Sequence, residues 1–106
     1  MKRNTISFNQ IKQSAKEISR TVHPKKVILF GSYANGTPGP NSDLDLLVIL
    51  KKGQKTCYEK VSRIFEPRVF PVDILVHTTS EIQQRLKKGD AFIQEILNKG
   101  KVLYEL

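Results

Sequence analysis

Three aspartates lie in segments that are otherwise strongly apolar. Asp43 and Asp45 open the apolar segment 43–50, and Asp73 interrupts the apolar segment 69–77. An ionised carboxylate that is buried without a partner is strongly unfavourable, so each must meet a cation, a hydrogen-bond donor or water. Residues i and i+2 of a strand point to the same face, about 6.6–6.8 Å apart along the backbone. Asp43 and Asp45 are therefore expected to share one face.

Pairing of the two segments would gather all three carboxylates into one patch. Cross-strand neighbours have Cβ atoms about 4.5–5.5 Å apart, which would bring Asp73 beside the other two. Carboxylate oxygens are preferred Mg²⁺ ligands, and two such ions about 3.5–4 Å apart suit an in-line displacement at phosphorus. Each acid alone has a plainer explanation: Asp43 caps a loop, Asp45 pairs with a lysine, and Asp73 follows Pro71 in a turn. That all three interrupt apolar strands, on the face opposite the core, favours a shared site.

A glycine–serine pair offers a place for phosphate. Gly31 follows the apolar run 27–30, and Ser32 is expected to open a short helix that includes Asn35. A helix N-terminus presents free backbone N–H groups and a positive dipole end, and glycine lacks the Cβ that would block close approach. The alternative is a tight turn followed by a simple cap. The sequence contains neither the P-loop nor the dinucleotide-binding glycine motif.

The elements that must position these residues alternate between helices and strands. Apolar residues spaced by three and four predict helices, which are expected over 8–22, over 57–65, after a Thr78–Glu81 capping box and after an Asp90 cap. Short apolar runs predict strands, which are expected at 27–30, 43–50, 69–77 and 102–104, with a loop at 36–42. The last helix is expected to turn four apolar side chains inward, namely Phe92, Ile93, Ile96 and Leu97. This pattern predicts an α/β (α+β) fold with a sheet covered by helices on at least one face.

Length and charge set the limits of these interpretations. The chain has 106 residues and a net charge of +8, and we expect residues 1–106 to form one domain. Residues 27–50 contain two acids and no base, whereas lysine and arginine are in excess in the segments before and after them. Positive charge therefore surrounds the candidate site in sequence and would attract anions. A solubilising surface is the plainer explanation of that charge. No apolar run reaches the roughly 20 residues of a membrane span, and the lone Cys57 leaves no internal disulfide. We therefore expect a cytoplasmic protein without a membrane partner.

The order Gly31-Ser32, ten residues, then Asp43-Leu44-Asp45, with Asp73 on a later strand, resembles the minimal nucleotidyltransferases of the DNA polymerase beta superfamily. The resemblance implies a mixed β-sheet flanked by helices. It implies that the three aspartates are catalytic and hold Mg²⁺, with two ions expected. It also implies that Gly31 and Ser32 bind the triphosphate. The implied activity is transfer of a nucleoside monophosphate, usually AMP from ATP, to a hydroxyl group with release of pyrophosphate.

The chain departs from the family pattern at two positions. Tyr33 and Asn35 stand where many relatives carry arginine, so the short helix lacks a cation, and Lys25 and Lys26 are the candidates to replace it. Because the chain is small, we also expect it to lack a second domain that grips the acceptor. Minimal members are similar to the antitoxin of a two-protein module, so the resemblance implies a protein partner, a HEPN-type toxin.

Two other functions remain open from the sequence. A non-catalytic antitoxin-type module would neutralise its partner by contact alone, and the missing arginine at Asn35 favours it. A basic nucleic-acid-binding domain would show affinity that falls steeply with salt. No recognition helix supports that second alternative, so nucleic acid is not the favoured partner.

Overall fold

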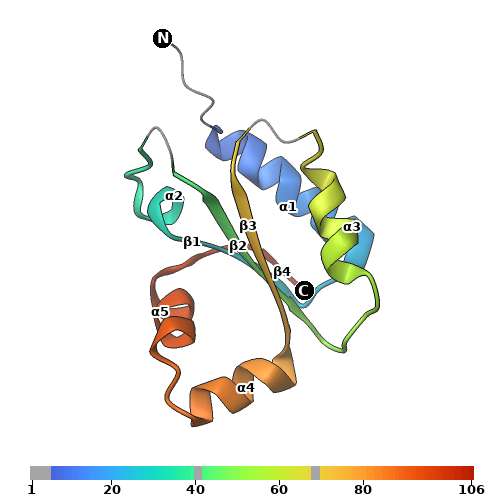
Figure 1. Cartoon of the computed structure of the whole chain (residues 1–106), viewed down its shortest axis with the longest axis vertical. Helices are drawn as coiled ribbons and strands as arrows, with labels where there is room; N and C mark the ends of the chain where they lie inside the picture. Colours follow the sequence, from blue (N-terminus) through green and yellow to red (C-terminus); the bar gives the residue numbers. More distant parts are fainter. Residues whose placement is uncertain (1–5, 40–41, 68–69) are drawn as a thin grey trace.

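A mixed four-stranded sheet forms the centre of the computed structural model, which describes residues 6–39, 42–67 and 70–106. The strands lie in the order β3-β2-β1-β4 (Figure 1). β1 is antiparallel to both β2 and β4, whereas β2 and β3 are parallel, which confirms the predicted mixed sheet. In chain order the elements are α1 (Phe8–Val22), β1 (Lys26–Phe30), α2 (Ser32–Asn35), β2 (Leu44–Leu50), α3 (Cys57–Ile64), β3 (Val72–Thr78), α4 (Thr79–Lys87), α5 (Ala91–Lys99) and β4 (Lys101–Glu105).

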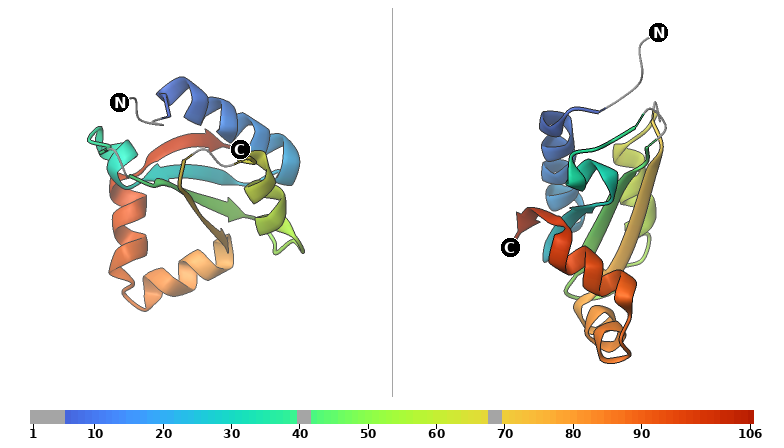
Figure 2. Two further views of the ribbon diagram at one scale, coloured as in Figure 1. Left: turned by 45° about the horizontal axis from the view of Figure 1, so that its top comes forward. Right: turned by 90° about the vertical axis from the view of Figure 1, so that its left-hand side faces the viewer.

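Helices cover both faces of the sheet. The larger core lies between the sheet and the pair α1 and α3, where Leu44, Leu46 and Val48 are buried, as the alternation in the sequence predicts. The helices α4 and α5 lie on the other side of the sheet (Figure 2). A smaller core forms there, to which they contribute Ile82 and Ile96. The helices α4 and α5 cover only part of this second face. The starts of β2 and β3, where the aspartates lie, are therefore not covered by these two helices.

Local capping signals place three of the helices. Ser7 accepts a hydrogen bond from the Gln10 N–H, and the Gln10 side chain accepts one from the Ser7 N–H, so the predicted α1 capping box is present. Thr78 and Glu81 make the same reciprocal pair at α4, and Asp90 caps α5. These caps satisfy N–H groups that have no partner within a helix.

The structure corrects several expectations. Phe92 was expected to point inward, but its side chain is 56% exposed, because Ile93 and Ile96 already fill the space between α5 and the sheet. β3 begins at Val72 and not at residue 69, which lies outside the described residues, as do residues 40 and 41 of the expected loop. β4 spans Lys101–Glu105 and is longer than expected. In the described part of the chain, every helix is too short or too polar to cross a membrane.

Candidate active site

The strand directions bring the sequence motifs to one edge of the sheet. Asp45 on β2 is paired in register with Asp73 on β3, because the parallel strands start at the same edge. β1 runs the opposite way and pairs Phe30 with Asp45, so its end and the following Gly31 reach the same edge. Asp43 lies one residue before β2. The predicted pairing of the two aspartate-bearing strands is therefore confirmed.

Gly31 is required by close contact with Asp45. Its φ of 77° is in the region that side chains disfavour. A Cβ built on Gly31 would also overlap Oδ2 of Asp45. The backbone of the glycine turn therefore lies directly against the carboxylate, which explains why no larger residue fits there.

A cavity of about 340 Å³ opens at this edge. The sheet contributes Asp45 and Asp73 to its wall, the turn and α2 contribute Gly31 and Asn35, and α5 contributes Phe92 and Lys99. Small-molecule sites commonly fall between about 300 and 1,000 Å³. The cavity therefore has the size of a small-ligand site and combines acidic, basic and aromatic groups in one wall.

Negative charge at the cavity has no internal partner. In the ranges 6–39, 42–67 and 70–106, no hydrogen bond or ion pair reaches the carboxylates of Asp43, Asp45 or Asp73. Burial, and then the charges of Asp73 and Asp43, raise the pKa of Asp45 to about 6. The folded protein therefore holds these acids close together at a cost that a bound cation would relieve.

The donor set suits a hard divalent cation such as Mg²⁺, because all three groups offer carboxylate oxygens. They do not form a finished cage: among the described residues, no three acidic, histidine or cysteine side chains are close enough to enclose an ion. Asp45 and Asp73 line the cavity, whereas Asp43 is exposed beside it. A metal would therefore have to draw the carboxylates together.

The glycine–serine turn has the predicted local form. Ser32 opens α2, and Gly31 lines the cavity, whereas Ser32 is half-buried beside it. In the part of the chain that the structure describes, the backbone N–H groups of Ser32 and Tyr33 donate to no acceptor. The side chain of Tyr33 packs on the larger core, and its hydroxyl contacts the Ile6 N–H at 3.5 Å. Tyr33 thus has a structural role at the position where the family resemblance leads us to expect arginine.

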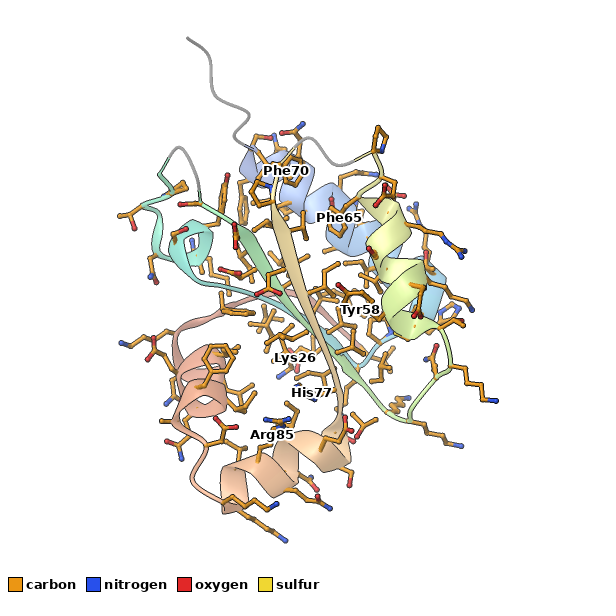
Figure 3. The ribbon with its side chains drawn as sticks, viewed as in Figure 1. Lys26, Tyr58, Phe65, Phe70, His77 and Arg85 are labelled. Carbon is orange, nitrogen blue, oxygen red and sulfur yellow. The ribbon has the colours of Figure 1, made fainter. Side chains whose placement is uncertain are left out.

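The expected replacement cations lie in the wrong place. Lys26 is at the opposite end of β1 from Gly31, where it forms an ion pair of 3.4 Å with Glu105. Figure 3 shows Lys26 near His77 and α4, far from α2. Lys25 lies at that same distant end, beside α4. Neither lysine lines the cavity, so this expectation was wrong.

Sequence reasoning missed the contribution of α5. Lys99 lines the cavity, and no carboxylate among the described residues lies within ion-pair distance of it. Its only signal in the sequence is its place in the last turn of a helix that ends at Gly100, a position where lysine is common for helix-dipole reasons. The return of α5 to β1 through Gly100, not the spacing of residues, places this cation at the site.

Comparison with known proteins decides the family. A model described as a nucleotidyltransferase domain matches residues 9–104, nearly the whole chain. The chain belongs to this nucleotidyltransferase family. The resemblance first indicated by Gly31, Ser32 and the aspartates is thereby confirmed, and the protein is a nucleotidyltransferase.

Relatives of this nucleotidyltransferase include one close in length. A Methanocaldococcus jannaschii protein named "putative protein adenylyltransferase" is 36% identical over 94 residues, which are 85% of this chain and 91% of that protein. One chain of a toxin–antitoxin crystal structure with AMP-PNP has a TM-score of 0.56 at 24% identity, covering 90% of this chain and 73% of that one. One chain of a mutant MntA–HpeT toxin–antitoxin structure gives 0.54 at 20% identity, with the same coverage. At these identities the two structures establish the fold alone.

Asp45 makes the stability of the nucleotidyltransferase depend on pH. Because its pKa rises from 3.8 in the unfolded chain to about 6, the contribution of Asp45 to stability is greatest below about pH 4 and declines until about pH 6. Asp45→Asn should remove this decline. After allowance for solvent screening, the variant should gain about 1 kcal/mol in free energy of unfolding at pH 8, which corresponds to a melting temperature about 4–8 °C above that of wild type. Near pH 4 the two should melt together. Circular-dichroism melts at both pH values check this, and equal melting at pH 8 would contradict it.

Proposed function

We propose that this nucleotidyltransferase moves AMP from ATP to a hydroxyl group on a partner protein, and that the partner is a HEPN-type toxin. The observation that carries the proposal is the meeting of Asp45, Asp73 and Gly31 in one cavity. The name of the archaeal relative supports AMP as the transferred group, and the toxin–antitoxin neighbour supports a toxin as partner. The resemblance to minimal nucleotidyltransferases supplies the HEPN type.

The acidic residues are assigned to the metal end of the reaction. We assign Asp43, Asp45 and Asp73 to two Mg²⁺ ions, whose charge, when bound, would offset that of the phosphates. The acceptor oxygen forms a bond to the α-phosphorus as the bond to the bridging oxygen breaks, and pyrophosphate leaves. Asp73, which is exposed at the mouth of the cavity, accepts the proton of the acceptor hydroxyl. Its exposure would let a large acceptor reach it.

Binding of the triphosphate is assigned to the glycine–serine turn and to α5. The unengaged N–H groups of Ser32 and Tyr33 are suited to donate to phosphate oxygens. Gly31 lets the phosphates approach the backbone, and Lys99 supplies the cation that the short helix α2 lacks. Together they would hold the triphosphate against the acidic wall.

Lys99→Ala should raise the KM for ATP about 10- to 100-fold, since a hydrogen bond to a charged group contributes about 1.5–3 kcal/mol. Lys51→Ala is the matched control, because Lys51 is exposed just after β2, at the end away from the cavity. Initial rates at varied ATP concentration distinguish the two variants. An unchanged KM in Lys99→Ala would remove Lys99 from the site.

The proposed function is tested by incubating the nucleotidyltransferase with Mg²⁺, ATP and the protein encoded beside it, followed by intact-mass measurement of both chains. The expected result is a mass gain of one AMP on the neighbouring protein and release of pyrophosphate. No gain on either chain, with ATP and Mg²⁺ present, would count against transfer to a protein.

Neutralisation of the partner by contact alone, without transfer, is the second candidate function. It is favoured by Asn35, because this residue lines the cavity with a neutral amide where the resemblance leads us to expect a cation. Under this alternative a variant with all three aspartates replaced by asparagine would still protect cells from the neighbouring toxin. Under the transfer proposal that variant would fail to protect, although it would still fold. Cell growth with both proteins expressed separates the two functions.

A further inference from the structure

Phe92 is an aromatic side chain held at the cavity and left open to solvent. α5 turns Ile93 and Ile96 into the smaller core, whereas Phe92 lies off that stripe and is 56% exposed. Its ring meets Phe30 edge to face, with centroids 5.8 Å apart and planes at 83°. Such a contact is a favoured aromatic geometry, which helps to fix the Phe92 ring.

Exposure alone would carry no meaning, since single exposed apolar residues are common on protein surfaces. Phe8 on α1 is exposed to a similar extent, 50%, but the ammonium groups of Lys12 and Lys101 each lie 5.7 Å from its ring centroid. Phe92 instead lines the same cavity as the acidic pair and Lys99. Its surroundings therefore differ from those of the other exposed phenylalanine.

The groups in the cavity divide by chemistry. Asp45 and Asp73, with a cation, and Lys99 suit the charged part of a ligand, whereas Phe30 and Phe92 suit a flat, weakly polar part. A nucleoside triphosphate has both parts in one molecule. Bases stack on aromatic rings with little regard to their identity, because every base has a π face.

We infer that Phe92, supported by Phe30, is the stacking surface for the base of the nucleoside triphosphate. The inference rests on the proposed function, since it takes the ligand of the cavity to be a nucleotide. It assigns the charged wall to the triphosphate and the aromatic pair to the base. Phe92 accordingly contributes affinity for the nucleoside half and does not choose between bases.

The test compares ATP with inorganic tripolyphosphate, which shares the phosphates and lacks the base. With Mg²⁺ present, Phe92→Ala should weaken ATP binding about 10-fold and leave tripolyphosphate binding unchanged. Phe92→Leu keeps apolar bulk but loses the flat face, so it should also weaken ATP, whereas Phe92→Trp should bind ATP at least as well as wild type. Isothermal titration calorimetry measures each affinity, and melting curves check that each variant is folded.

Phe8→Ala is the matched control, because it removes an exposed phenylalanine that does not line the cavity and should leave ATP binding unchanged. ATP binding by Phe92→Ala within twofold of wild type would overturn the inference while leaving the proposed function intact. So would equal weakening of ATP and tripolyphosphate, or a loss confined to binding of the partner protein. Wild-type protein that binds neither ligand would overturn both the inference and the proposed function.

Discussion

Asp45→Asn is expected to reduce AMP transfer by about 1000-fold while the chain remains folded. The carboxylate of Asp45 lies between the paired Asp73 and the glycine turn, so asparagine would remove charge at the centre of the proposed metal site. Loss of one well-placed electrostatic group typically lowers kcat by about 100- to 1000-fold, and a metal site concentrates such effects. Transfer of label from ATP to the partner protein, at saturating ATP, measures the loss.

Glu17→Gln is the control for removing one negative charge, because Glu17 is exposed on α1, across the sheet from the cavity. It should transfer AMP at the wild-type rate. Transfer by Asp45→Asn within tenfold of this control would mean that Asp45 does not serve the reaction, whatever the melting behaviour of the variant.

Gly31→Ala is expected to lower both stability and transfer. The Gly31 backbone, with φ 77° and ψ −156°, lies in a region that is essentially restricted to glycine, so a Cβ there should cost about 1–3 kcal/mol, which corresponds to a fall of about 4–24 °C in melting temperature. The new methyl group would also overlap the Asp45 carboxylate and push it from its position. A displacement of this kind should cost about 100-fold in transfer, because positioning of reacting groups is sensitive to small shifts.

Gly89→Ala separates these two effects. Gly89 has the same φ of 77°, but a Cβ there would meet no atom within 4 Å. It should lose stability without losing transfer. In a double-mutant cycle, the effects of Gly31→Ala and Asp45→Ala on the free energy of unfolding should be coupled, since the smaller side chain at position 45 relieves the overlap. Equal transfer by Gly31→Ala and Gly89→Ala would show that the close contact has no bearing on the reaction.

Much of the fold could be predicted from local signals. The capping residues Ser7, Thr78 and Asp90 and the alternation from Leu44 to Leu50 determine helix starts and a strand face through nearest neighbours, so they are readable along the chain. The same alternation predicted that the aspartates point away from the larger core. The register of Asp45 with Asp73 depends on strand direction, which no local pattern specifies.

The rest of the cavity wall depended on tertiary packing. Apolar spacing placed Phe92 with Ile93 and Ile96, but the sheet accepts only part of that stripe, so Phe92 was left at the cavity. Lys26 is near Gly31 in sequence, but Lys26 begins β1 and Gly31 follows its last residue, so the strand holds the two at opposite ends. Lys99 lies far along the chain from Gly31 and reaches the cavity through the turn at Gly100.

The parallel pairing of β2 with β3 has a consequence for when the protein becomes competent. Asp45 and Asp73 become neighbours only after the connection through α3 has brought β3 beside β2. The entropy cost of closing such a long connection is met before the stabilising contacts between the strands form. The wall formed by α5 is later still in synthesis. A nascent chain whose helix α5 is still inside the ribosome therefore lacks the complete cavity, which forms only when this helix has emerged and docked.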